Sequence, residues 1–124
     1  MVLDASALLC LLFREIGAER VAAVIPGARV STVNWAEVVA KLVDRGADGE
    51  RVRSRLQQLP IELVDFDRAR AERAGLLHAP TRALGLSLGD RACLALAAEL
   101  GAVAMTTDRA WAAFDPRIEI EVVR

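Results

Sequence analysis

Residues 86–108 read LSLGDRACLALAAELGAVAMTTD, and this stretch does most to decide the fold. Small and apolar side chains recur at helical spacing from Gly89 to Leu100, which predicts a helix. Gly101 can end that helix as a C-terminal cap. The residues that follow, 102–106, are apolar and form a run short enough for a buried strand. A helix that leads directly into such a strand is typical of an α/β fold with a parallel sheet.

The same alternation of strands and helices extends over the rest of the chain. Short apolar strands are predicted at residues 1–3, 29–31, 61–66, 102–106 and 118–123. Helices are predicted at residues 6–13, 18–25, 34–45, 49–59, 68–77, 89–100 and 109–114, while Pro80 leaves residues 80–86 undetermined. This order predicts an α/β fold whose central parallel sheet is covered on both faces. With 124 residues the chain is expected to form a single domain, 1–124.

The composition excludes several classes of protein. Hydrophobic residues make up 54% of the chain and charged residues 27%, which is incompatible with intrinsic disorder. The net charge of −1 excludes the binding of nucleic acid by bulk positive charge. Charged residues interrupt every apolar stretch before it reaches the ~20 residues that a membrane-spanning helix needs. No basic region precedes the first strand, so we expect no secretory signal and a cytoplasmic location.

The supply of histidine and cysteine limits the chemistry further. The sequence has one histidine, His78, and two cysteines, Cys10 and Cys93. This set cannot supply a zinc cluster, a Cys-His dyad or a Ser-His-Asp triad. Both cysteines lie among apolar residues of predicted helices, where cysteine acts as a small hydrophobic side chain and a disulfide is not expected. Any catalysis must therefore depend on carboxylates.

Four acidic residues lie where the predicted strands end. Asp4 follows the first strand, and Asp108 follows the strand at residues 102–106. Glu37 and Asp90 lie in the first turns of the helices predicted at residues 34–45 and 89–100. In parallel α/β sheets the functional site lies beyond the carboxyl ends of the strands. We therefore expect all four carboxylates at one edge of the molecule.

Each acid also has a purely structural interpretation. Any one of them could cap a helix, and two fit the three-residue spacing of a capping box, Asn34 with Glu37 and Ser87 with Asp90. Four converging carboxylates would, however, raise one another's pKa unless a cation lay between them. No lysine or second histidine is predicted at this edge, so a divalent ion is the expected counter-charge. Oxygen ligands favour Mg²⁺ or Mn²⁺, which suit reactions at phosphate.

The sequences around these acids resemble the acidic motifs of the PIN domain family. VLDASAL at residues 2–8 resembles the first motif, and NWAEV at residues 34–38 looks like the second. LSLGDRACLALA at residues 86–97 closely resembles the third, and TTDRAW at residues 106–111 looks like the fourth. Their order and intervals match as well. Within the family the chain is most similar to the VapC-type toxins of bacterial toxin–antitoxin pairs.

This resemblance implies a Rossmann-like α/β/α sandwich and a Mg²⁺- or Mn²⁺-dependent ribonuclease that hydrolyses RNA phosphodiester bonds. The catalytic metal ligands would be the residues at the family's acidic positions, namely Asp4, Glu37, Asp90 and Asp108. The supporting hydroxyls would be Ser6 and Thr106.

Three further positions bear on this assignment. Some family members carry another acid after the fourth motif, but Trp111 and Ala112 stand there in this chain. Asp115, further on, is interpreted as a turn residue. Arg91 is interpreted as a solvated helix residue, with a contact to substrate phosphate as the alternative.

The resemblance also implies partners. These are an RNA substrate, a second copy of the chain in a homodimer, and an antitoxin whose C-terminal segment covers the active-site cleft; no membrane is implied. The apolar residues Leu9, Leu12 and Phe13 could serve such a partner but are interpreted as core. Two other functions stay open, a PIN-domain nuclease that is not a toxin and a non-catalytic module that keeps the fold. An aspartyl-phosphate enzyme is disfavoured, because Ser6 stands where its second Asp would be and Lys41 lies in mid-helix.

Overall fold

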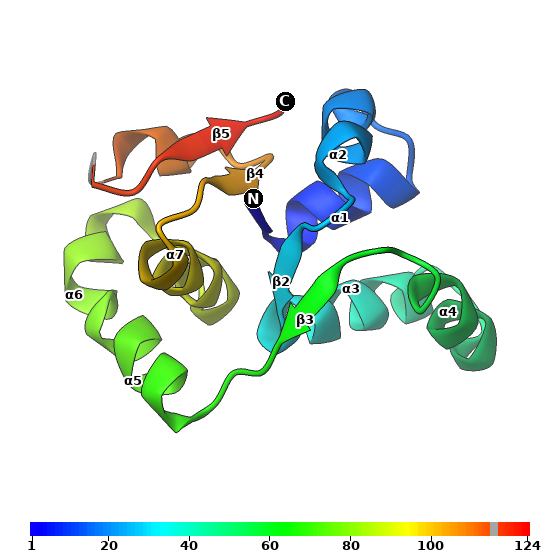
Figure 1. Cartoon of the computed structure of the whole chain (residues 1–124), viewed down its shortest axis with the longest axis horizontal. Coiled ribbons are helices and arrows are strands. Elements are labelled where there is room, and N and C mark those ends of the chain that lie inside the picture. Colours follow the sequence, from blue (N-terminus) through cyan, green and yellow to red (C-terminus); the bar gives the residue numbers. More distant parts are fainter. Residues whose placement is uncertain (115–116) are drawn as a thin grey trace.

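The computed structural model describes residues 1–114 and 117–124, and a five-stranded parallel sheet lies at its centre (Figure 1). The spatial order of the strands is β3-β2-β1-β4-β5. Their bounds are β1 Val2–Leu3, β2 Arg29–Ser31, β3 Glu62–Val64, β4 Ala104–Thr106 and β5 Ile120–Val122. The first strand of the chain therefore occupies the middle of the sheet, and its carboxyl end lies beside that of β4.

Helices cover both faces of this sheet, as the alternation of elements predicts (Figure 1). The α-helices are α1 Ala5–Leu12, α2 Ala18–Val24, α3 Thr32–Asp44, α4 Gly49–Leu56, α5 Arg68–Leu76, α6 His78–Thr81 and α7 Leu88–Leu100. Two short 3-10 helices are η1 Arg82–Leu84 and η2 Arg109–Ala113. The expected α/β sandwich is confirmed. In the described part of the chain, no helix is long and apolar enough to span a bilayer.

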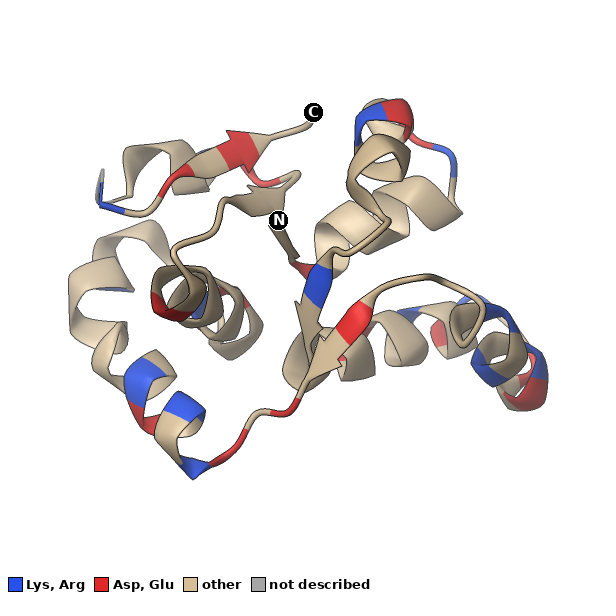
Figure 2. Cartoon of the chain, viewed as in Figure 1, with Lys and Arg blue, Asp and Glu red and all other residues tan. Residues whose placement is uncertain are grey.

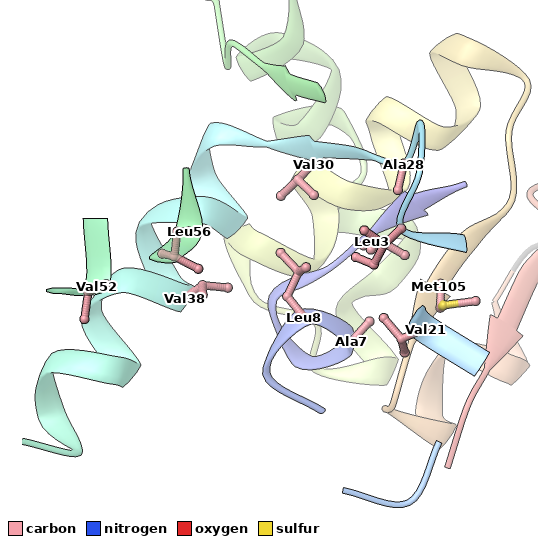
Figure 3. Packing of buried hydrophobic residues seen from close by; sticks show 11 residues of the cluster. Leu3, Ala7, Leu8, Val21, Ala28, Val30, Val38, Val52, Leu56 and Met105 are labelled. Carbon is pink, nitrogen blue, oxygen red and sulfur yellow. The ribbon is translucent and has the colours of Figure 1, made fainter. Parts of the chain in front are cut away.

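The two central strands show why both faces are apolar. Successive side chains of a strand point to opposite faces of the sheet. Leu3 and its register partner Met105 belong to the core cluster under α1, α2, α3 and α4 (Figure 3). Val2 and its partner Ala104 belong to the second cluster, which packs against α7 and η2. Because every position of β1 is buried, the strand reads as a continuous apolar run rather than an alternating one.

Several element boundaries differ from those expected. Helix α3 begins at Thr32 and is capped by Ser31, whose Oγ accepts from the backbone N of Val33 at 3.3 Å. The predicted capping box of Asn34 with Glu37 is therefore wrong, and Glu37 lies in the second turn rather than the first. The helix predicted at residues 109–114 is the 3-10 helix η2, and residues 102–103 precede β4 instead of belonging to it. The turn interpretation of Asp115 lies outside the described residues.

Candidate active site at the carboxyl edge of the sheet

Asp4 is the most buried acid of the candidate site. It follows β1 directly and caps α1, because its Oδ1 accepts from the backbone N of Ala7 at 2.8 Å. Ser6 Oγ donates to Oδ1 at 2.7 Å, and Thr106 Oγ1 donates to Oδ2 at 2.6 Å. Only 3% of Asp4 is exposed. The capping interpretation is correct for this residue, yet its second oxygen is held by β4 and not by the helix.

Burial raises the pKa of Asp4 from its ordinary value of 3.8 to about 6. The hydrogen bonds from Thr106, Ser6 and Ala7 lower the pKa, while the charge of Asp90 raises it further. These donors offset only part of the cost of placing a carboxylate where water cannot reach it. A buried acid with a perturbed pKa beside a second acid indicates a functional site.

Glu37 reaches the same edge of the sheet from α3. Asn34 Nδ2 donates to its Oε1 at 3.1 Å. Burial raises the pKa of Glu37, the bond from Asn34 lowers it, and the nearby charge of Asp90 raises it. The carboxylate lies against Gly89, where a methyl group would overlap it. Glu37 is therefore held between two helices, although it lies one helical turn further along α3 than the sequence predicts.

Asp90 lies in the first turn of α7, as predicted. The capping box is confirmed, since Ser87 N donates to Asp90 Oδ2 at 2.9 Å and Asp90 N donates to Ser87 Oγ at 3.2 Å. Asp90 is half-buried and lines the same cleft as Asp4 and Glu37. One carboxylate thus serves the helix terminus and also faces the cleft.

Asp108 lies apart from the other three acids. It is exposed and caps η2 through a bond from the backbone N of Ala110 to Oδ1, 2.9 Å. It does not belong to the lining of the cleft that contains Asp4. Its link to that cleft is indirect, because its backbone N donates to Thr106 Oγ1 at 3.1 Å, and that hydroxyl holds Asp4. The structure therefore brings three of the four predicted acids together.

The two predicted hydroxyls connect β1 to β4. Besides donating to Asp4, Ser6 Oγ accepts from the backbone N of Thr107 at 2.9 Å. Thr106 is completely buried. These bonds fix the orientation of the Asp4 carboxylate across two neighbouring strands. The supporting role that the resemblance implies for Ser6 and Thr106 is consistent with this geometry.

The cleft has a volume of about 440 Å³ and contains residues that sequence reasoning missed. Its walls are Asp4, Ala5, Ser6, Leu9, Asn34, Glu37, Ala40, Lys41, Asp44 and Asp90. Lys41 and Asp44 follow Glu37 by four and seven residues, which places all three on one face of α3. The expectation that no lysine lies at this edge is therefore wrong. The helical spacing from Glu37 could have identified both residues.

The donor set fits a hard divalent ion, because the lining of the cleft offers carboxylate and hydroxyl oxygens but no thiolate or imidazole. Within residues 1–114 and 117–124, no three His, Cys, Asp or Glu side chains are close enough together to form a ready metal cluster. The raised pKa values of Asp4 and Glu37 have burial as their main cause and Asp90 as a further one. A divalent cation would offset both effects and lower these pKa values, since it favours the charged form of each acid.

Arg91 contacts helix α5 and not the acidic cleft. It is half-buried, and its Nη1 donates to the backbone O of Ala74 on α5 at 3.2 Å. Its interpretation as a solvated helix residue is therefore wrong. Arg91 fastens α7 to the last residues of α5 and is not part of the lining of the acidic cleft.

The fold and the cleft define the class of the protein: an α/β protein with a cluster of carboxylates at the carboxyl ends of its parallel strands. The chain belongs to the PIN domain family, whose model matches residues 1–115. This match confirms the resemblance that the four acidic motifs indicate.

Solved structures of the same fold include several toxin–antitoxin complexes. One from Klebsiella pneumoniae contains a chain with a TM-score of 0.76 and 21% identity, over 99% of this chain and 97% of that one. DNA-bound VapBC from Salmonella typhimurium contains a chain with a TM-score of 0.74 and 19% identity, over 99% of this chain and 97% of that one. VapBC-5 from Mycobacterium tuberculosis contains a chain with a TM-score of 0.61 and 25% identity, over 99% of this chain and 96% of that one. These likenesses extend the shared fold over the whole chain, whereas no curated protein matches it.

Proposed function

We propose that this chain is a Mg²⁺- or Mn²⁺-dependent endoribonuclease of the VapC type, the toxin of a toxin–antitoxin pair. The observation that carries this function is the cleft in which buried Asp4 lies with Glu37 and Asp90. Membership of the PIN domain family supports nuclease chemistry. The toxin–antitoxin complexes that share the fold support the assignment as a toxin.

The residues that would hold the metal in the cleft are Asp4, Glu37 and Asp90. Asp108 is proposed as a fourth ligand on the family resemblance alone, because its side chain caps η2 outside the cleft. A divalent ion held there would supply Lewis-acid chemistry, namely activation of water and compensation of charge on the scissile phosphate. Ser6 and Thr106 keep both oxygens of Asp4 in a fixed orientation, so this ligand needs no reorganisation. A carboxylate that is not fully engaged as a ligand would orient the attacking water as general base.

The surface charge outside the cleft contributes little to the affinity of the enzyme for RNA. Figure 2 shows Lys and Arg on α4 and α5 beside acidic residues, and ion pairs such as Arg53 with Glu50 and Arg70 with Glu99 neutralise part of this charge. Affinity for phosphate must therefore come mainly from the metal and from neighbours such as Lys41. We expect cleavage in an exposed single-stranded loop of a structured RNA, where bases can be read.

A second, larger groove of about 820 Å³ is the proposed antitoxin surface. Its walls come from α1, α3, α4 and the residues after α1 and α3, and include Leu12, Phe13, Leu42, Val52, Leu56, Arg51 and Arg55. Leu12 and Phe13 are only partly buried here, so their interpretation as core residues is incomplete. The antitoxin would bind this apolar groove and extend to the acidic cleft, which Leu9 of the same helix lines. A homodimer is proposed on the family resemblance.

Cleavage of RNA by the purified chain is expected to need a divalent ion. Millimolar Mg²⁺ or Mn²⁺ should support cleavage of total cellular RNA, and excess EDTA should abolish it, because three of the predicted acids, Asp4, Glu37 and Asp90, share the cleft. Either ion should also raise the melting temperature by several degrees, since it binds only the folded state. Mapping the new 5′ ends would identify the target. Full activity in excess chelator would exclude metal-dependent hydrolysis.

Expression of the chain alone is expected to arrest bacterial growth, and the product of an adjacent small gene should relieve the arrest. Glu37→Gln should remove the arrest but keep binding of that product, because the side chain retains its shape and loses the charge that holds metal. If expression is harmless while the purified protein degrades all RNA indiscriminately, the protein is a nuclease but not a toxin. A purified chain with no metal-dependent cleavage would favour the non-catalytic module.

A further inference from the structure

We propose that Asn34 is a positioning residue that sets the Glu37 carboxylate in the cleft by joining it to α7. Glu37 is a metal ligand only under the proposed function, so the importance of this role for metal binding rests on that function. The burial of Asn34, its two hydrogen bonds and its unpaired oxygen carry the inference.

Asn34 links two acidic helices through a single nitrogen. It lies one turn before Glu37 on α3, and only 1% of it is exposed. Its Nδ2 donates to Glu37 Oε1 at 3.1 Å and to the backbone O of Gly89 at 3.0 Å. An amide nitrogen carries two protons, one for each of these acceptors. The Glu37 carboxylate is thereby fixed to the first turn of α7, directly beside Asp90.

The oxygen of the same amide indicates that stability is not the reason for this arrangement. Among the residues that the structure describes, Asn34 Oδ1 is buried and has no hydrogen-bond partner. The reverse orientation of the amide would turn Oδ1 toward the Glu37 carboxylate and the Gly89 carbonyl, which are both acceptors. An unpaired buried oxygen destabilises a fold, so its presence needs an explanation. The donor group on Nδ2 supplies one.

Gly89 also limits the position of the Glu37 carboxylate. A methyl group on Gly89 would overlap both the carboxyl carbon and the oxygens of Glu37. Alanine is otherwise the better residue inside a helix. The glycine is therefore explained by the close approach of the Glu37 carboxylate to the backbone of α7.

The test is a double-mutant cycle on the dissociation constant of Mn²⁺, measured by calorimetry on the full chain. The four proteins are wild type, Asn34→Ala, Glu37→Ala and the double variant. Asn34→Ala is expected to weaken Mn²⁺ binding about 10- to 100-fold, as the loss of an outer-shell partner does. In the Glu37→Ala background the same change should alter the constant by less than about twofold, because Asn34 acts through Glu37.

Matched variants separate positioning from general stability. Asn34→Leu keeps much of the size of the side chain and removes both donors without adding a charge, so it should weaken Mn²⁺ binding at least as much as Asn34→Ala. Gly89→Ala should also weaken it, because the flexible end of Glu37 must move. Ser31→Ala removes the N-cap bond of α3 and should lower the melting temperature by a few degrees without changing the dissociation constant.

Wild-type Mn²⁺ affinity in Asn34→Ala, or an equal loss in both backgrounds, would overturn the positioning role. Failure of the proposed function has a different signature, namely a wild-type protein whose Mn²⁺ binding does not depend on Glu37. In that case the melting temperatures of the four metal-free proteins decide. Non-additive shifts would support the contact between Asn34 and Glu37, and additive shifts would overturn it.

Discussion

The Asp4→Asn variant is expected to be more stable than the wild-type protein at pH 8 without metal, by up to about 3 kcal/mol. The reason is that burial moves the pKa of Asp4 from 3.8 to about 6, and each pKa unit corresponds to about 1.4 kcal/mol. An asparagine oxygen can still accept from Ser6 and Ala7, so the cap of α1 remains. RNA cleavage should nevertheless fall more than about 100-fold, beyond the usual cost of an outer-shell change.

The pH dependence of this gain identifies its cause. Between the unfolded pKa of 3.8 and the folded pKa of about 6, the folded protein binds more protons at Asp4 than the unfolded chain does. The free energy of unfolding of the wild-type protein therefore falls as the pH rises through this window. The variant lacks this contribution, so the two proteins should differ most at pH 7 to 8 and least below pH 4.

Urea unfolding in EDTA across this pH range measures the effect. Asp48→Asn is the matched control, because Asp48 also caps a helix, α4, but is exposed and accepts from the backbone N of Glu50 at 3.0 Å. This control should show no gain in stability at any pH. Parallel pH profiles for wild type and Asp4→Asn would mean that Asp4 is not an ionised buried acid.

The order of strands and helices could be predicted because it depends on local patterns. The apolar run at residues 1–3, the Pro26-Gly27 pair before the strand at residues 29–31 and the glycine cap at residue 101 mark element ends within a few residues of sequence. The start of α3 could not be predicted in the same way. Ser31 and Asn34 are both good helix caps; in the structure Ser31 is the cap, while Asn34 lies inside the helix and bonds to Gly89 on α7. A contact over 55 positions leaves no local signal.

In the candidate site, too, local patterns could be predicted from the sequence and long-range contacts could not. Asp4 and Asp90 could be placed from their own motifs, since a strand end and a helix start determine where each side chain lies. Lys41 lies in mid-helix, away from the strand ends where a site is expected, so only its spacing of four residues from Glu37 indicates that it reaches the cleft. Capping by Asp108 was among the structural interpretations, but its separation from the cleft was missed, because a position after a strand does not determine how near the side chain lies to the other acids. Side-chain convergence requires tertiary packing that periodicity alone does not define.

The two roles of Asp90 can be separated by Asp90→Asn and Ser87→Ala. Asparagine keeps an oxygen that can accept from the backbone N of Ser87, so Asp90→Asn should cost no more than about 1 kcal/mol of stability. Loss of its charge also relieves the repulsion that raises the pKa of Asp4 and Glu37, which favours the metal-free fold. RNA cleavage should still drop more than about 100-fold, because a proposed metal ligand is removed.

Ser87→Ala gives the opposite pattern and completes the comparison. It removes the hydroxyl that accepts from the backbone N of Asp90 at 3.2 Å, which should cost about 1 kcal/mol, while the carboxylate stays in the cleft. Cleavage should therefore remain within a few-fold of wild type. Urea unfolding without metal and RNA cleavage with Mn²⁺ measure both effects on each protein. If Asp90→Asn were folded and fully active, Asp90 would be a helix cap alone, and the proposed metal ligands in the cleft would be reduced to Asp4 and Glu37.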